Sequence, residues 1–195
     1  MSKRFALLSA VALSALAITT IVVAPATAEE KKMMKSELSG EKTVMVGGAA
    51  MFPSKNIVQN AVNSKDHTTL VAAVKAAGLV PTLESKGPFT VFAPTNAAFG
   101  KLPAGTVDNL VKPENKATLT KILTYHVVPG KLEASSLTNG KKLKTVEGEE
   151  LTVKLADGKV WIVDAKGGSA AVTIANVNQS NGVIHVVDTV LMPAS

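Results

Sequence analysis

The sequence contains no cysteine among its 195 residues. A chain without cysteine has no disulfide framework, no cysteine-ligated zinc or iron–sulfur cluster and no thiol nucleophile. Aromatic residues make up only 4% of the chain, and the single arginine is Arg4. Because arginine and stacked aromatic rings carry much of the specific recognition of phosphates and bases, we expect no nucleic-acid partner.

Histidine is scarce too, and the chain has only His67, His126 and His185. They fall on an early helix, a helix-to-strand junction and a late strand, without close ligand spacing, so we predict no metal site. We expect His67 to be exposed on its helix. The sequence also lacks the Gly-x-Ser-x-Gly elbow, the His-Glu-x-x-His motif and a phosphate-binding loop. We therefore predict that the protein is not an enzyme and binds no cofactor.

A long apolar run occurs only at the N-terminus. Lys3 and Arg4 precede an almost uninterrupted apolar stretch over residues 5–24, and Ala26-Thr27-Ala28 follows it. A basic start, an apolar middle and a small-residue cleavage site are typical of a secretory signal peptide. We predict that residues 1–28 are removed and that the protein is exported to the periplasm, the cell surface or the medium. A retained membrane anchor is the alternative, because the run approaches the length that spans a bilayer.

Residues 29–55 are predicted to form a flexible connector. Residues 29–42 are charged and lack an apolar period, and Gly47-Gly48 and Pro53 interrupt regular structure. Four of the methionines lie at or near this stretch: Met33, Met34, Met45 and Met51. Thioethers can bind Cu(I), but filler that packs partly on the domain is the favoured interpretation.

Residues 56–193 are predicted to form one domain, in which helices come before most of the strands. Apolar residues follow a helical period over 57–62 and 70–77, with Asp66 as the expected N-cap of the second helix and Gly78 as its stop. A buried strand over 89–93 follows.

The last third of the domain has the pattern of β-structure. Strands are expected over 151–155, 159–163, 171–174 and 182–187. Asp157-Gly158 separates the first two and is a strong hairpin signal. Helices followed by strands, with one strand between helices, indicate an α+β fold.

Three segments of this domain resemble the signatures of the fasciclin domain family. They are residues 87–99, residues 125–130 with the sequence Tyr-His-Val-Val-Pro-Gly, and residues 182–193. The exported single-domain arrangement resembles the small secreted bacterial members. The resemblance implies a β-wedge with helices packed on the sheet, a role in cell-surface or matrix adhesion, and no general catalytic activity.

The polar residues of these motifs are the candidate site, as structural or interaction residues: Thr95, Asn96, Tyr125, His126, His185 and Asp188. We expect Thr95 to cap a short helix. Asn96 either closes a turn or contacts a partner. The Tyr125-His126 pair is associated in the family with receptor contact, but its polar atoms can also join buried backbone segments, and we favour this structural role. We expect a neighbour to satisfy His185 within the sheet, and Asp188 to cap or orient the strand end.

The sequence thus predicts an exported adhesion or matrix module that binds a protein or polysaccharide through an extended surface. Its lysine-rich face favours weak attraction to acidic polysaccharides. The alternative is a secreted carrier or sensor that holds a small hydrophobic or glycan ligand in a cleft. No membrane span is expected after signal cleavage. The partner's identity and the oligomeric state are not set by the sequence.

Overall fold

The computed structural model describes residues 41–194 as nine strands, six α-helices and three short 3₁₀ turns. The strands are β1 Val44–Val46, β2 Ala49–Met51, β3 Phe89–Pro94, β4 Val127–Pro129, β5 Lys142–Lys144, β6 Glu150–Ala156, β7 Lys159–Val163, β8 Ser169–Gln179 and β9 Gly182–Val187. The helices are α2 Ile57–Ala61, α3 Thr68–Ala77, α4 Val80–Glu84, α5 Asn96–Gly100, α6 Thr106–Leu110 and α7 Lys116–Tyr125, and the turns are η1 Lys65–His67, η2 Pro113–Asn115 and η3 Ala134–Ser136.

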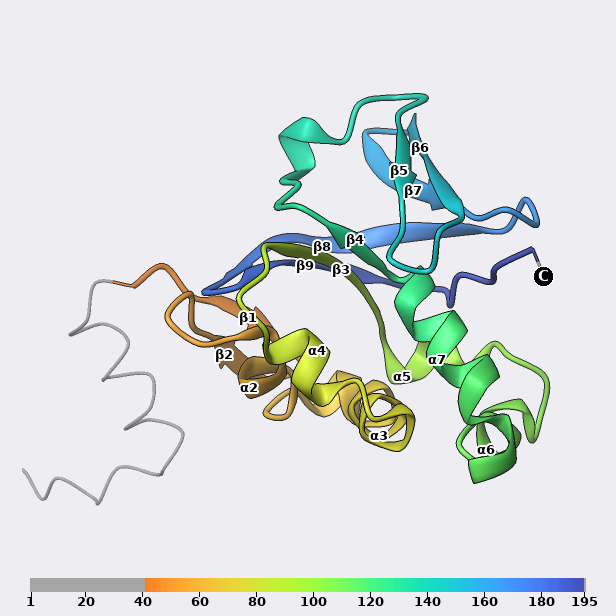
Figure 1. The fold of residues 1–195 in the computed structure, drawn as a ribbon. Helices are drawn as coiled ribbons and strands as arrows, with labels where there is room; N and C mark the ends of the chain where they lie inside the picture. The colour runs from red at the N-terminus through yellow and green to blue at the C-terminus, as the bar shows by residue number, and fades with distance from the viewer. Residues whose placement is uncertain (1–40, 195) are drawn as a thin grey trace, which may run out of the picture.

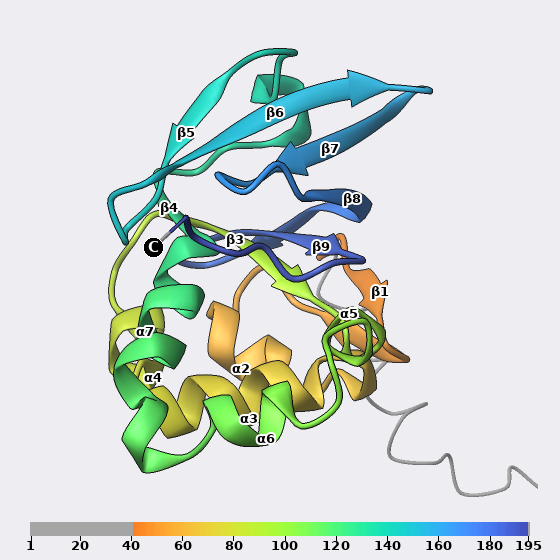
Figure 2. The ribbon, with the colours of Figure 1, turned by 90° about the vertical axis from the view of Figure 1, so that its right-hand side faces the viewer.

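Seven strands form one mixed sheet in the order β4-β3-β9-β8-β7-β6-β5. Only β3 and β9 pair in parallel, and every other pair in this sheet is antiparallel. The long β8 bends where its register against β9 shifts on either side of Ile174. The bend folds β5–β7 back over the rest of the sheet (Figures 1 and 2), and the Val146 N–H donates to the Val127 carbonyl at 2.7 Å. The sheet is therefore nearly closed.

The molecule has three layers. The central strands, β3, β4, β8 and β9, form the middle layer, with β5–β7 on one side and the helices on the other (Figure 2). Alternate residues of β3 serve the two interfaces: Val91 packs against the helices and Phe92 faces β5–β7. The burial of both faces of β3, expected from its apolar composition, is confirmed. This architecture also confirms the predicted α+β wedge.

Residues next to the helix ends determine where α5 begins and where α3 ends. The Thr95 hydroxyl accepts from the Ala98 N–H and caps α5 as predicted, and Gly78 ends α3 at a left-handed φ of 72°. The prediction that Asp66 is the N-cap of α3 was wrong, because Lys65–His67 form η1 and α3 starts at Thr68. A residue of another helix supplies the acceptor instead, since Asn96 Oδ1 accepts from the Thr69 N–H at 3.0 Å.

Part of the predicted connector is ordered structure. Within residues 41–55, β1 and β2 pair as a hairpin whose turn contains Gly47-Gly48, so these glycines shape a regular element rather than preventing one. Val46, Met51 and Phe52 are buried. The predicted signal peptide (1–28) and the start of the connector (29–40) lie outside the described residues.

The predicted hairpin at Asp157-Gly158 is confirmed, since β6 and β7 pair directly across it. Asp157 and Gly158 both have positive φ angles, 54° and 70°, as a tight two-residue turn requires. Within residues 41–194, no helix has both the length and the apolar character needed to cross a membrane.

Candidate functional site

His126 forms a joint between α7 and the C-terminal segment. It is 2% exposed and stands at the C-terminal end of α7. Its Nδ1 donates to the Ile122 carbonyl at 2.8 Å, and its Nε2 accepts from the Leu191 N–H at 3.0 Å. Burial lowers the pKa of His126 to about 4, against a smaller opposing effect of the Ile122 carbonyl. The imidazole is therefore neutral in the folded protein at neutral pH.

Tyr125 makes a second joint on the other side of the central strands. Its ring is buried in the core under β5–β7. The hydroxyl donates to the Glu150 carbonyl at 3.3 Å and accepts from the Ala165 N–H at 2.9 Å. Burial raises the pKa of Tyr125, and the Ala165 hydrogen bond opposes this. Tyr125 and His126 thus bind α7 to different parts of the molecule.

His185 lies in β9 and has different neighbours from His126. Its Nε2 donates to the Leu132 carbonyl at 2.8 Å, and its Nδ1 accepts from the Asn176 N–H at 3.4 Å. Its ring stacks on Phe92, with centroids 5.7 Å apart. Burial lowers the pKa of His185, so it too is neutral in the fold. Each of the two motif histidines uses both ring nitrogens within the chain.

Asp188 directly follows β9 and contacts the neighbouring strand β8. Its Oδ1 accepts from the Ala171 N–H at 2.9 Å and from the Thr189 hydroxyl, and its Oδ2 pairs with Lys101 Nζ at 3.3 Å. Partial burial raises the pKa of Asp188, but these hydrogen bonds outweigh it and lower the pKa overall. The Lys101–Asp188 pair is exposed and links α5 to the chain after β9.

Asn96 uses its whole amide to hold α5 against the start of α3. Its Oδ1 accepts from the Thr69 N–H and the Thr68 hydroxyl, while its Nδ2 donates to the Lys65 carbonyl at 2.8 Å. The structure therefore distributes the predicted site residues over several separate joints instead of gathering them in one place. Within residues 41–194, no group of three or more His, Cys, Asp or Glu side chains is arranged to hold a metal ion.

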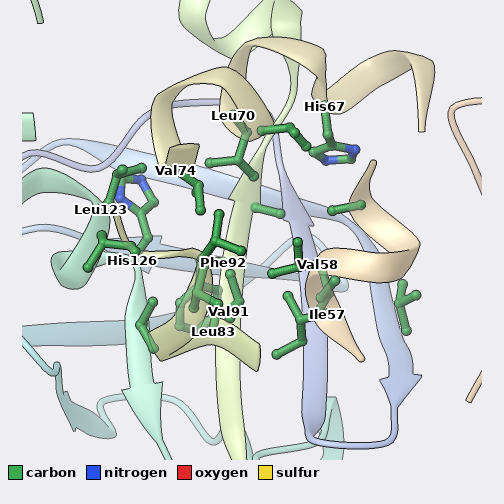
Figure 3. Close-up of a pocket in the computed structure, with 18 of the residues that line it drawn as sticks. Ile57, Val58, His67, Leu70, Val74, Leu83, Val91, Phe92, Leu123 and His126 are labelled. Atoms are coloured by element: carbon green, nitrogen blue, oxygen red, sulfur yellow. The ribbon is translucent and has the colours of Figure 1, made fainter. Parts of the chain in front are cut away.

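An apolar cavity of about 60 Å³ lies between the central strands and helices α2, α3 and α4 (Figure 3). Its lining includes Val58, Leu70, Val74, Leu83 and Val91. Val58 is only half-buried, and the exposed Lys75 also lines the cavity, so the hollow reaches the surface beside α2 and α3. The mostly aliphatic lining of this cavity suits an apolar ligand.

Three polar residues, His67, Lys75 and His126, are also in the lining, and Figure 3 shows the two histidine rings. The prediction that His67 is exposed was wrong: it is 3% exposed, because its side chain faces the cavity. Its Nδ1 lies 2.9 Å from Ser64 Oγ, while Nε2 has no hydrogen-bond partner of good geometry among the described residues. Burial lowers the pKa of His67, although the nearby Ala93 carbonyl raises it.

This cavity was not predicted from the sequence. The stripe of Leu70, Val71, Val74 and Ala77 indicated a buried helix face, and the first three of these residues line the cavity. The sequence offered one hint that His67 is buried, which is Ser64, a possible hydrogen-bond partner three residues earlier. The polar residues around His67 favoured exposure instead. Whether a buried face is completely filled depends on distant elements, so periodicity cannot show it.

Comparisons with known proteins identify the relatives of this chain. The family model described as the fasciclin domain matches residues 65–193. Protein sll1483 of Synechocystis sp. is 53% identical over 153 residues, which are 78% of this chain and 82% of that protein. Cell surface glycolipoprotein MPB83 of Mycobacterium bovis is 33% identical over 181 residues, which are 90% of this chain and 78% of the relative.

A solved structure shares the fold. It is a FAS1 domain pair from the insect cell adhesion molecule Fasciclin I, which matches with a TM-score of 0.65 and 18% sequence identity. The match covers 72% of this chain and 52% of the solved chain, so this chain spans about half of that domain pair.

Proposed function

The chain belongs to the fasciclin domain family, and on that premise we propose that it is an exported adhesion module that binds a protein or polysaccharide partner through an extended outer surface. Two relatives support this role. One is named a cell surface glycolipoprotein, and the solved neighbour comes from a cell adhesion molecule. The basic, apolar and small-residue pattern of residues 1–28 supports export.

The observation that carries the proposal is the internal use of the motif side chains. His126 and His185 have both ring nitrogens in hydrogen bonds, and the hydroxyl of Tyr125 contacts two backbone groups. A buried polar group that is already paired gains little from a partner and costs free energy when it is exposed. These side chains therefore support a scaffold rather than a catalytic centre, and recognition is left to the exterior.

The experiment compares attachment of the folded protein to its native envelope or matrix material with its thermal stability. His126→Gln is expected to lower the melting temperature and attachment together, because the Leu191 N–H loses its acceptor. Replacement of exposed lysines with glutamine is expected to weaken attachment at an unchanged melting temperature. Attachment lost in His126→Gln at an unchanged melting temperature would contradict the scaffold interpretation.

The cavity favours a second candidate function, the carriage of a small apolar ligand. Its walls are mostly aliphatic, and the buried His67 adds one polar side chain to the lining. The volume of about 60 Å³ is smaller than the cavity of about 150 Å³ that is known to bind benzene, so a slender aliphatic chain is the fitting ligand.

A thermal-shift titration with linear alcohols tests this second function. The expected result is a melting temperature that rises with ligand concentration, as binding to the folded state alone requires. Val58→Trp, which places a bulky ring at the half-buried side of the cavity, is expected to abolish the shift. No shift with any chain length in the unsubstituted protein would reject carriage and leave the adhesion proposal intact.

A further inference from the structure

Trp161 is the only tryptophan of the chain, and it lies on the outer face of the sheet. Its neighbour Ile162 is fully buried in the core under β5–β7, as are Leu151 and Val153 of the adjacent strand. Because side chains alternate along a strand, Trp161 points to the opposite, solvent-facing side. It is half-buried there. Packing of the core therefore does not account for this large ring.

The indole lines an open hollow of about 450 Å³ on the β6–β8 face. Val163 and Ala156 add apolar surface beside the ring, while Lys154, Asp157 and Ser169 supply a cation, a carboxylate and a hydroxyl. Lys154 stands directly opposite Trp161 on the paired strand. The hollow thus combines one aromatic face with three kinds of polar group, within the size range of small-ligand sites.

The polar groups of this hollow have no partner in the part of the chain that the structure describes. No hydrogen bond or ion pair involves the side chains of Lys154, Asp157 or Ser169, whereas nearby Lys142 pairs with Glu150 at 3.2 Å. The Nε1–H of Trp161 is shielded from solvent and also finds no acceptor within residues 41–194. The exposed side chains of Lys154, Asp157 and Ser169, next to the aromatic ring, are therefore available to a ligand that brings hydroxyls and charge.

The surrounding charge selects the sign of the ligand. The outer face of β5–β7 carries Lys142, Lys144, Lys154 and Lys159, against only Glu150 and the turn residue Asp157. A face with excess positive charge attracts polyanions.

We propose that this hollow, the Trp161 face, binds an acidic polysaccharide chain whose sugar rings carry carboxylate groups. The apolar face of a sugar ring packs on the indole, the Lys154 ammonium pairs with the sugar carboxylate, and Asp157 and Ser169 hydrogen-bond ring hydroxyls. An open hollow admits a residue within a long chain as well as a chain end. The inference rests on the proposed adhesion role and names the partner's chemistry.

Fluorescence provides a direct test, because Trp161 is the only indole. Emission excited selectively from tryptophan is followed while galacturonic acid oligomers are added to the intact mature protein. Dextran serves as a neutral sugar control, and polyglutamate as a polyanion without sugar rings. We expect a saturable spectral change with the galacturonic acid oligomers alone. No change, or an equal response to polyglutamate or dextran, would overturn the proposal.

Variants locate the site. Lys154→Gln keeps the fluorophore and is expected to weaken binding about tenfold, since it removes one charge-assisted contact. Lys112→Gln is the matched control. Lys112 is exposed and follows α6 by two residues, and Figure 2 shows α6 in the helical layer, away from β6 and β7. Its replacement is expected to leave binding unchanged. Trp161→Ala, measured by calorimetry, is expected to abolish binding. Equal loss in Lys154→Gln and Lys112→Gln would show attraction by net charge and reject the site.

The same variants separate this inference from the proposed function. Attachment to native envelope material is measured in parallel, together with the melting temperature of each variant. Attachment that persists in a folded Lys154→Gln variant, with no galacturonic acid oligomer bound by the parent, would reject the Trp161 face and leave the adhesion role standing. Loss of attachment together with oligomer binding, at an unchanged melting temperature, supports both.

Discussion

At the scale of single residues, β3 shows how one strand supports two interfaces. Phe92 is fully buried and stacks on His185, whereas Phe89 is only half-buried at the start of the strand. Both rings lie in the same apolar run of the sequence. Their burial separates them, because only Phe92 lies between β9 and the folded-back strands.

We predict that Phe92→Ala reduces the free energy of unfolding by about 3–5 kcal/mol, as loss of a fully buried aromatic ring does. Phe89→Ala is expected to cost about 1–2 kcal/mol, because less of its ring leaves water on folding. Urea denaturation of both variants measures the difference. Equal losses of stability in the two variants would contradict the conclusion that Phe92 is more deeply buried than Phe89.

At the scale of elements, the β1–β2 hairpin is part of the domain. The amide of Asn60 in α2 accepts from the Phe52 N–H at 3.1 Å and donates to the Phe52 carbonyl at 2.8 Å, which fixes the end of the hairpin to the helix. The Lys65 N–H donates to the Gly47 carbonyl at 3.1 Å. Gly47 has a φ of 57°, and a side chain there would meet the Asp66 nitrogen at 2.7 Å, so glycine is required at this turn.

A chain that starts at residue 56 is therefore expected to be less stable than one that starts at residue 41. It lacks Val46, Met51 and Phe52, and each buried apolar side chain contributes about 1.5–3 kcal/mol, so the loss should be at least ~4 kcal/mol. Urea melts of the two fragments make the comparison. Equal midpoints would restore the view that residues 41–55 are only a connector.

At the scale of the whole molecule, the three histidines have the same protonation state. Burial lowers the pKa of His67, His126 and His185, so the fold holds all of them neutral. In the unfolded chain they titrate near 6.5, and His126 titrates at about 4 in the fold. Between these values the unfolded state binds more protons, so stability falls as the pH decreases.

We predict that His126 alone accounts for ~3 kcal/mol of lost stability as the pH is lowered from 6.5 to 4, since each pKa unit corresponds to about 1.4 kcal/mol. Urea melts across this range measure the slope. His126→Gln should be less stable at pH 7.5 but show a flatter profile in acid. Asp188 has little effect in this range. Its pKa is lowered from the ordinary 3.8, so the stability that it contributes is lost mainly below pH 3.8. An unchanged slope in His126→Gln would refute the assignment.

Local patterns in the sequence were sufficient for the α+β class, the strands of the last third, the Thr95 cap and the Asp157-Gly158 turn. Each of these depends on a residue and its near neighbours in the chain, through alternation, capping or backbone preference. They also identified Tyr125, His126 and His185 as residues with polar atoms that need partners.

Only the tertiary structure decided what those partners are. Leu191 lies 65 residues from His126, and Asn96 caps a helix 27 residues earlier, so no local pattern shows either contact. The burial of His67, the hairpin within residues 41–55 and the unpaired hollow around Trp161 likewise arise where distant elements meet. The sequence determined which elements form and which side chains need hydrogen bonds, because those properties are local; folding decided which needs are met inside the chain and which are left for a ligand.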